Sequence, residues 1–318
     1  MPVLALDIGG TKLAAAVVTA AGQVLAERME ATKSSSSPAE ILDTLFAMAG
    51  EVNRRAALGW PELAGVGVSF GGPMDFPSGR TVTCHHLEGW QDFPLRQAVG
   101  ARVGRPVVVD NDANAAALGE ATFGAARSKP YVLYLTVSTG IGGGIVLGGR
   151  VHRGANSLAG EIGHTLVAPE GPVCTCSRRG CLEAVASGPA IATAARQALE
   201  AGEPSALASI PRSQLTAREV AAAAASDALA ARVMSRAGEY LGLAIAGAVN
   251  LLNPSIVVVG GGVSEAGEAL FRPLREAVAR HAVPESARGL AIAAGALGQR
   301  GALLGAAALA LTDQYQAW

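Results

Sequence analysis

The sequence has no large excess of charge of either sign, no hydrophobic run long enough to span a membrane and no N-terminal signal segment. Its 25 Lys and Arg residues nearly balance 26 Asp and Glu residues, so the formal net charge at pH 7 is -1. That balance predicts no general attraction to nucleic acid or to an anionic membrane. Polar residues interrupt the Ala-rich stretches before they reach the roughly 18 to 20 apolar positions of a membrane span. We therefore expect a cytoplasmic protein.

The length and the order of apolar runs predict a two-domain α/β protein. A chain of 318 residues suits two average domains. The runs typical of buried strands are residues 3–8, 14–18, 65–68, 107–109, 131–137, 145–147 and 256–259. The stretches with helical periodicity are residues 38–58, 114–124, 188–202, 216–252, 266–281 and 295–311. We place the domain boundary near 114–124, and the final helix could return to the first domain.

Two segments, residues 4–12 and 133–144, repeat one pattern. Each has an apolar run, a glycine turn that can adopt positive φ, and a second apolar run. Exposed backbone N–H groups at such turns bind anions, and Thr11, Lys12 and Thr139 add side-chain donors. The lysine loop of Walker-type NTPases is absent from the sequence. The repetition favours two phosphate-binding loops over two ordinary glycine hairpins, although hairpins would better explain either segment alone.

Asp7 and a third glycine segment each keep two interpretations. Asp7 stands between an apolar run and its glycine turn, where a carboxylate beside phosphate could ligate Mg²⁺ directly or through water. Residues 257–264 again lead from an apolar run through glycines towards a helix. These glycines could let a nucleobase or ribose lie against the backbone, or they could serve close packing of helix on strand.

Acidic residues follow the apolar run 107–109, at a position where open α/β sheets commonly bind ligands. Asp110 and Asp112 are candidate general bases, because phosphoryl transfer to a hydroxyl needs a carboxylate within reach of the attacking O–H. Either acid could instead cap the helix that follows. The local sequence leaves both roles open.

A histidine and a cluster of three cysteines within eight residues indicate a metal site. The four side chains are His164, Cys174, Cys176 and Cys181. Disulfides are rare in cytosolic proteins, so this set predicts a tetrahedral Cys₃His zinc. Four protein ligands leave no open coordination position, and the zinc would therefore be structural. Cys84 stands apart as a free thiol, and the adjacent His85 and His86 are better explained as a polar loop than as metal ligands.

Taken together, these motifs resemble the ROK family of sugar kinases, within the actin, Hsp70 and hexokinase superfamily. The resemblance extends from Ala5 to about Gly305. It implies a two-lobed, actin-like (ribonuclease H-like) α/β fold with an interlobe cleft and a small zinc-binding module. A small lobe would comprise residues 1–118 and a C-terminal helix over about 296–318, and a large lobe residues 119–295.

The resemblance also implies roles for individual residues, with Asp112 as the general base. Sugar hydroxyls would be bound by Gly71, Gly72, Asn111, Asp112, Glu161, His164 and Glu183. The nucleotide would be bound by Asp7, Gly9, Gly10, Thr11, Lys12, Thr139, Gly140, Gly142, Gly143, Gly261 and Gly262. His164 would use one ring nitrogen for zinc and the other for the sugar, since a metal-bound imidazole can still donate from its far nitrogen.

Two positions depart from the family pattern. Many members have Pro-Asn-Leu where this chain has His85, His86 and Leu87, so the resemblance assigns no sugar contact to these residues. Ser177 replaces the glycine that often follows the second cysteine of the zinc module.

The activity implied by the resemblance is ATP-dependent phosphorylation of a hexose, with ATP, Mg²⁺ and structural Zn²⁺ as cofactors. Glucose at its 6-hydroxyl is the leading expectation, and N-acetylmannosamine, N-acetylglucosamine and fructose are the alternatives. A homodimer, or a homotetramer built as a dimer of dimers, is expected. Sugar-responsive repressors of the family carry a DNA-binding domain ahead of the first glycine turn. Only six residues precede Asp7 and no basic stripe is present, so we expect no nucleic-acid or membrane partner.

Overall fold

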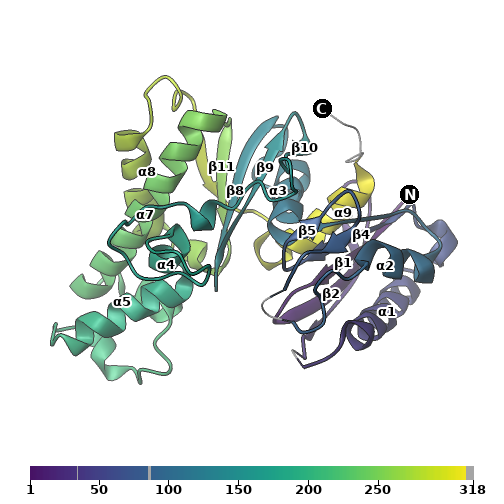
Figure 1. Cartoon of the computed structure of the whole chain (residues 1–318), viewed down its shortest axis with the longest axis horizontal. Helices are drawn as coiled ribbons and strands as arrows, with labels where there is room; N and C mark the ends of the chain where they lie inside the picture. The colour runs from purple at the N-terminus through teal and green to yellow at the C-terminus, as the bar shows by residue number, and fades with distance from the viewer. Residues whose placement is uncertain (34, 85–86, 313–318) are drawn as a thin grey trace. The chain divides into compact units, whose positions relative to one another are not determined.

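The computed structural model describes residues 1–33, 35–84 and 87–312, which form two compact units (Figure 1). The first unit holds residues 1–130, 144–160 and those from Gln299 onward. The second unit holds residues 131–143 and 161–298. His85 and His86, for which we predict a polar loop, lie outside the described residues.

The first unit is built on a five-stranded mixed sheet with the order β3-β2-β1-β4-β7. Its strands are β1 (Val3–Ile8), β2 (Lys12–Val18), β3 (Val24–Ala31), β4 (Val66–Phe70) and β7 (Val107–Asn111). Strands β1, β2 and β3 are antiparallel neighbours, whereas β4 and β7 run parallel to β1. Every residue of β1 and β4 is buried, as expected for central strands covered on both faces.

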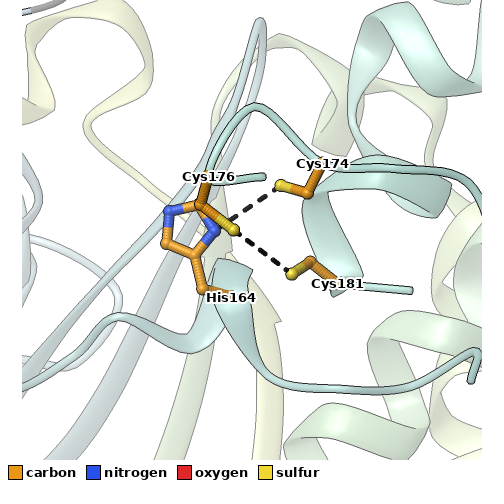
Figure 2. Close-up of side chains that lie close together, drawn as sticks. All are labelled: His164, Cys174, Cys176 and Cys181. Carbon is orange, nitrogen blue, oxygen red and sulfur yellow. Dashed lines mark hydrogen bonds between the residues drawn. The ribbon is translucent and has the colours of Figure 1, made fainter. Parts of the chain in front are cut away.

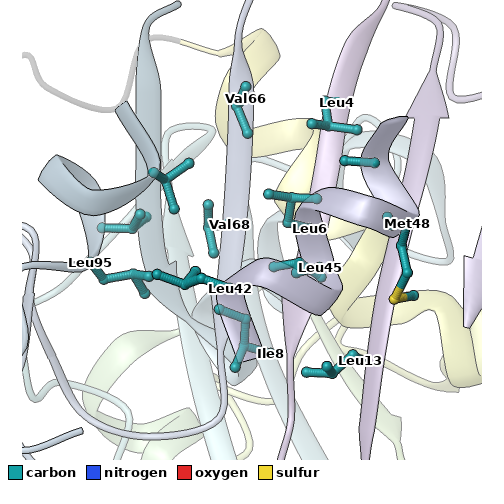
Figure 3. Close-up of a cluster of buried hydrophobic side chains, with 14 of the residues drawn as sticks. Leu4, Leu6, Ile8, Leu13, Leu42, Leu45, Met48, Val66, Val68 and Leu95 are labelled. Carbon is teal, nitrogen blue, oxygen red and sulfur yellow. The ribbon is translucent and has the colours of Figure 1, made fainter. Parts of the chain in front are cut away.

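Helices cover both faces of this sheet. They are α1 (Pro38–Arg55), α2 (Leu95–Val103), α3 (Asp112–Phe123) and α9 (Gly301–Leu311). Leu4, Leu6 and Ile8 alternate along β1 and pack into the core with α1 and α2 (Figure 3). On the other face α9 lies on β1 and β4 although it is far from them in sequence (Figure 1). The approach is so close that a Cβ on Gly67 would lie 1.7 Å from the carbonyl oxygen of Ala306.

Helix α1 begins directly after its N-cap residue, Ser37. The Ser37 hydroxyl accepts a hydrogen bond from the Glu40 N–H, and the Glu40 carboxylate accepts one from the Ser37 N–H at 2.7 Å. This reciprocal capping box, with Pro38 in the first turn, fixes where the helix begins. A short hairpin of β5 (Met74–Asp75) and β6 (Arg80–Thr81) follows β4 in the same unit.

A second sheet has the order β10-β9-β8-β11-β12. Its strands are β8 (Tyr131–Val137), β9 (Ile141–Leu147), β10 (Arg150–Val151), β11 (Ile256–Gly260) and β12 (Ala291–Ala294). In the second unit β8, β11 and β12 are parallel, with Val259 paired to Leu135 and Gly260 paired to Thr136. The chain crosses from the second unit into the first within β9, after Gly143.

The helices of the second unit are α4 (Leu182–Ala186), α5 (Gly188–Glu200), α6 (Ala217–Ala223), α7 (Ala228–Leu252) and α8 (Glu268–His281). The two longest, α7 and α8, pack closely because α7 presents glycines. A Cβ on Gly242 would lie 2.4 Å from the carbonyl oxygen of Leu274. Across the described residues, no helix is both long and apolar enough to cross a membrane.

The single long helix expected over 216–252 is wrong. Helix α6 ends at Ala223, and Asp227 then caps the start of α7 by accepting the Ala230 N–H at 2.9 Å. The same carboxylate accepts the Ala206 N–H at 2.7 Å, so it ties a preceding loop to the break. A side chain that caps a helix competes with continuation of the helix before it. The α/β class itself is confirmed.

Candidate active site

Strand register in the first unit gathers the predicted polar residues at one edge of the sheet. Asp7 pairs with Ser69, and Ser69 pairs with Asp110, across three parallel strands. One residue further, Ile8, Phe70 and Asn111 form the next row. Because the carboxyl ends of parallel strands meet at the same edge, the first glycine turn, the loop after β4 and Asp112 are neighbours there.

The first glycine turn joins β1 to β2. The Gly9 N–H donates to the Lys12 carbonyl at 3.0 Å, and the Thr32 hydroxyl donates to the Gly9 carbonyl at 2.7 Å. Gly10 is half-buried and Thr11 is exposed, so the tip of the turn is accessible to a ligand. The Lys12 ammonium donates to the Gln299 carbonyl at 2.8 Å, which ties the turn to the segment before α9.

Asp7 is a buried carboxylate just before this turn. Its exposed fraction is 4%, and its Oδ1 accepts a hydrogen bond from the Ser69 hydroxyl at 2.8 Å. Burial raises the pKa of Asp7, and the Ser69 hydrogen bond and the charge of Lys12 oppose that rise. No motif in the sequence singles out Ser69, which is fully buried on β4.

Asn111 caps α3, the role that the sequence left open for Asp110 or Asp112. Its Oδ1 accepts the Ala113 N–H at 2.9 Å and the Asn114 N–H at 3.3 Å. Its amide nitrogen donates to the Gly72 carbonyl at 3.1 Å and to Asp112 Oδ1 at 3.0 Å. Asn111 therefore connects the helix start, the loop after β4 and the Asp112 carboxylate.

Asp112 keeps one oxygen available. Oδ1 also accepts the Ala113 N–H at 2.8 Å, whereas Oδ2 has no hydrogen-bond partner among the described residues. Burial raises the pKa of Asp112 to about 6, and the negative charge of Asp7 adds to the rise. Such a group is ionised at neutral pH and is still basic enough to accept a proton.

Asp110 has no comparable freedom. Its Oδ1 accepts the Asn111 N–H at 2.8 Å and the Asn114 side-chain amide at 3.0 Å. Its Oδ2 accepts a hydrogen bond from Arg153 Nε at 2.8 Å. The structure thus separates the two candidate acids: Asp110 is fully engaged, and Asp112 can face a ligand.

The loop after β4 carries Gly71 and Gly72, to which the resemblance assigns sugar binding, and it lies against the first glycine turn. The Gly71 N–H donates to the Ile8 carbonyl at 2.8 Å, and a Cβ on Gly71 would lie only 3.3 Å from the same oxygen. A Cβ on Gly72 would lie 2.8 Å from the Thr83 carbonyl oxygen. Both positions need the small size of glycine for this loop to pack as it does.

The second unit holds the other glycine turn. The Ser138 N–H donates to the Gly140 carbonyl at 2.9 Å. Thr139 is exposed, Gly140 and Gly142 are half-buried and Gly143 is buried, so the backbone is most accessible near the start of the turn. Beside it, Gly261 has a φ of +82°, and a Cβ there would lie 2.3 Å from the Val137 carbonyl oxygen. Gly262 next to it is exposed.

The four predicted metal ligands come together in the second unit (Figure 2). Cys174 Sγ lies 3.7 Å from His164 Nδ1, and Cys176 Sγ lies 3.6 Å from Cys181 Sγ. All four ligand atoms lie within 4.8 Å of one another. Around a tetrahedral zinc with Zn–S bonds of about 2.3 Å, neighbouring sulfur atoms are about 3.8 Å apart. The donor set and its spacing therefore fit a tetrahedral ion.

Glu183 links this cluster to the second glycine turn, a connection that the sequence did not suggest. Its Oε1 accepts the Thr175 hydroxyl at 2.9 Å, and its Oε2 accepts the Ile141 N–H at 3.0 Å. Glu161 is more exposed, with Oε2 3.8 Å from His164 Nε2. The two ring nitrogens of His164 thus face Cys174 and Glu161, respectively.

The described residues form an α/β protein in which glycine turns and carboxylates follow strands, and a cluster of one histidine and three cysteines precedes α4. Residues 3–313 match the family model described as ROK family. The chain belongs to the ROK family, as its motifs predict.

Named relatives cover nearly the whole chain. A glucokinase from Halalkalibacterium halodurans is 38% identical over 307 residues, which span 94% of this chain and 92% of that protein. The structure of a ROK hexokinase from Thermus thermophilus is 37% identical, covers 97% of each chain and has a TM-score of 0.81. A Streptomyces griseus ROK glucokinase in complex with glucose and AMPPNP is 33% identical, covers 97% of this chain and 99% of its own, and has a TM-score of 0.82.

Proposed function

We propose that the protein is an ATP-dependent hexose kinase that phosphorylates glucose at its 6-hydroxyl, with Asp112 as general base. The observation that carries the proposal is the Asp112 carboxylate, whose Oδ2 has no hydrogen-bond partner in the part of the chain that the structure describes, while Oδ1 is held by Asn111 and Ala113. Full-length similarity to proteins named glucokinase and hexokinase supports the substrate class.

The chemical role of Asp112 follows from its position and basicity. Its free oxygen would accept the proton of the sugar hydroxyl as that hydroxyl attacks the γ-phosphorus of ATP. A base of this kind contributes roughly 10²- to 10⁴-fold to the rate. Asn111, Gly71 and Gly72 would bind and orient the sugar from the same sheet edge, so that the attacking oxygen meets the base.

The glycine turns supply the nucleotide contacts in this proposal. Backbone N–H groups at Gly10, Gly140, Gly142 and Gly143 would bind phosphate oxygens, the Gly9 N–H would shape the first turn through its bond to the Lys12 carbonyl, and Gly261 and Gly262 would lie against adenosine. Thr11, Lys12 and Thr139 would add side-chain donors. Asp7 would hold Mg²⁺, directly or through water, because its Oδ2 remains available once Ser69 binds Oδ1. When bound with ATP, Mg²⁺ neutralises phosphate charge.

The second unit would also bind the sugar. Glu161, His164 and Glu183 would accept or donate hydrogen bonds to its hydroxyls. We assign Zn²⁺ to the Cys₃His cluster as a structural ion, since four protein ligands leave no coordination position for substrate. The two units would be the lobes of an actin-like fold, and the proposed assembly is a homodimer.

The test is a panel of sugars with ATP as donor. Purified protein is assayed for ADP release with glucose, fructose, N-acetylglucosamine and N-acetylmannosamine, and kcat/KM is compared among them. Glucose is expected to give the highest value. A higher value for an N-acetylhexosamine would change the substrate, and absence of any sugar-stimulated ADP release would end the kinase proposal.

A further inference from the structure

Arg153 is a largely buried cation in the first unit, and the proposed mechanism leaves it without a role. It follows β10, and its side chain is 11% exposed. Nε donates to Asp110 Oδ2 at 2.8 Å, and Nη2 lies 2.7 Å from the same oxygen. Nη1 donates to the Val151 carbonyl at 3.3 Å. The guanidinium is thus held between Asp110, near the end of β7, and the Val151 carbonyl of β10.

The contacts of Arg153 continue through Asp110 to the proposed base. With Oδ2 held by Arg153, Oδ1 of Asp110 accepts the Asn111 N–H and the Asn114 side-chain amide. These two donors lie on either side of Asp112 in sequence. Asn111 in turn donates to Asp112 Oδ1. The orientation of Asp112 therefore depends on a carboxylate whose own orientation depends on Arg153.

A second set of contacts connects Arg153 to the loop between β5 and β6, which follows Gly71 and Gly72 in the chain. Its guanidinium carbon lies 3.4 Å from the centroid of the Phe76 ring, a cation–π geometry. The Phe76 N–H donates to the Ser157 hydroxyl at 3.2 Å, so the segment carrying Arg153 holds this loop twice. Arg153 thus contacts both Asp110, the acid beside the proposed base, and the loop between β5 and β6, which follows Gly71 and Gly72 in the chain.

Stability alone is a weak reason for such an ion pair. Removing two charges from water costs free energy that a buried pair only partly recovers, and apolar replacements are often as stable. A planar guanidinium does offer geometry that other side chains lack, because it can hold a carboxylate while stacking on a ring. The arrangement therefore points to orientation as its function.

We propose that Arg153 is a positioning residue that, through Asp110 and Phe76, holds Asp112 and the β5–β6 hairpin next to Gly71 and Gly72 in the geometry needed for proton transfer. The inference rests on the proposed kinase function. Substitution would leave the ATP contacts in place and misalign base and hydroxyl, and a misplacement of about 1 Å can cost roughly 10² in rate.

The test combines kinetics with a double-mutant cycle. Arg153→Met is expected to lower kcat roughly 10- to 100-fold with little change in the KM for ATP. Arg153→Lys keeps the charge without the planar fork, and should recover less than half of the loss on a logarithmic scale. In an Asp112→Ala background, where no base remains to be positioned, Arg153→Met should have almost no further effect on kcat.

Arg102 provides a matched control in the same unit. It pairs with Asp43 at 2.7 Å and lies 5.0 Å from the Phe46 ring centroid, but it contacts none of the proposed site. Arg102→Met should leave kcat unchanged. Equal kcat losses for Arg153→Met in the wild-type and Asp112→Ala backgrounds would indicate a merely structural role and overturn the inference, as would unchanged kcat in a folded variant.

Amide hydrogen exchange gives a readout that does not depend on activity. Arg153→Met should speed exchange at least about tenfold in peptides covering residues 107–118, where Asp110 and Asn111 hold the backbone. Arg102→Met should not. If the wild-type protein phosphorylated no sugar, the proposed function would fail, and exchange would still decide for or against the Arg153 linkage.

Discussion

The carboxylates of Asp7 and Asp112 belong to the same edge of one sheet, and the negative charge of Asp7 raises the pKa of Asp112. The larger cause of the rise is burial, which brings this pKa to about 6. The two acids are proposed to act on different substrates, Asp7 on the metal–nucleotide complex and Asp112 on the sugar. Their electrostatic coupling therefore connects the two halves of the reaction.

The first prediction concerns the pH dependence of the reaction. A general base acts in its ionised form, so kcat/KM should fall as pH decreases through about 6. Asp7→Asn removes a negative charge and should move this acid limb to lower pH, whatever it does to the maximal rate. Asp43→Asn, which removes an exposed carboxylate paired with Arg102, should leave the limb in place. The comparison is a set of pH–rate profiles, and an unshifted limb in Asp7→Asn would contradict the coupling.

The second prediction is that Asp112→Asn stabilises the fold while abolishing most activity. The pKa of Asp112 in the folded state is about 6, above the ordinary value of 3.8, so folding favours the protonated carboxyl group. As the pH rises from about 4 to above 6, the folded protein therefore loses stability relative to the unfolded chain. The asparagine oxygen can keep the bonds from Asn111 and Ala113 without the charge. At pH 8 the variant should be more stable by at most about 3 kcal/mol, and the gain should shrink towards zero below pH 4.

Urea unfolding at pH 4, 6 and 8 measures this difference directly. The decisive feature is the dependence of the gain on pH, because a packing effect would be the same at each value. Turnover of Asp112→Asn should be at least about 10²-fold lower than that of the wild type. A folded variant with near-normal turnover would remove Asp112 from the base role.

Local patterns in the sequence predicted the parts of the site that local structure builds. Glycines after apolar runs indicated where both turns lie, and the clustering of three cysteines indicated the group that they form with His164. The α/β class followed from the alternation of strand-like apolar runs with stretches of helical periodicity along the chain. Each glycine turn depends on residues within a few positions of one another, and the metal-ligand set lies within residues 164–181, so backbone preferences and ligand chemistry indicate both from short segments.

Features set by tertiary contacts were not predictable in the same way. Strand β3 is a half-exposed edge strand that pairs with β2. Its charged residues interrupt the apolar pattern from which a strand is predicted. Helix α2 was not predicted because it is only 9 residues long, so that Leu95, Val99 and Val103, spaced four apart on its buried face, give a pattern of just three positions. The break before α7 depends on Asp227 binding a loop about twenty residues earlier in the chain.

The partners of Asp110 show the same limit within the site. The sequence has Asp110 two residues before Asp112 but gives no sign that Arg153, 43 residues later, binds it. The one available signal was general: a carboxylate next to a buried strand needs a donor or a cation. Many arginines could have supplied it, so only the fold identifies which one does.

The third prediction is one zinc per chain, bound by the Cys₃His cluster. Elemental analysis of purified protein should give a ratio near one, and Cys176→Ser should lose the metal because it removes one of four ligands. Cys84→Ser is the matched control, since Cys84 lies outside the cluster and its thiol is 3.8 Å from the Gly71 carbonyl oxygen. Equal zinc content in wild type and Cys176→Ser would refute the assignment.

Because Glu183 joins the cluster to Ile141, the zinc-free variant should also bind ATP analogues more weakly.

The fourth prediction separates backbone strain from loss of nucleotide contacts at Gly261. Its φ of +82° disfavours alanine, and the added Cβ would lie 2.3 Å from the Val137 carbonyl, next to the second glycine turn. Gly202 has nearly the same φ, +85°, but nothing lies within 4 Å of its would-be Cβ. Both alanine variants should lose stability because a side chain disfavours positive φ, and at Gly261, whose ψ of 163° lies in a region that glycine alone commonly adopts, the loss should be roughly 1 to 3 kcal/mol. Only Gly261→Ala must also displace the turn, so calorimetry should show at least about tenfold weaker binding of an ATP analogue for that variant and wild-type affinity for Gly202→Ala. Equal affinities in the two variants would mean that the segment after β11 packs the helix and does not touch adenosine, which is the other interpretation that the sequence left open.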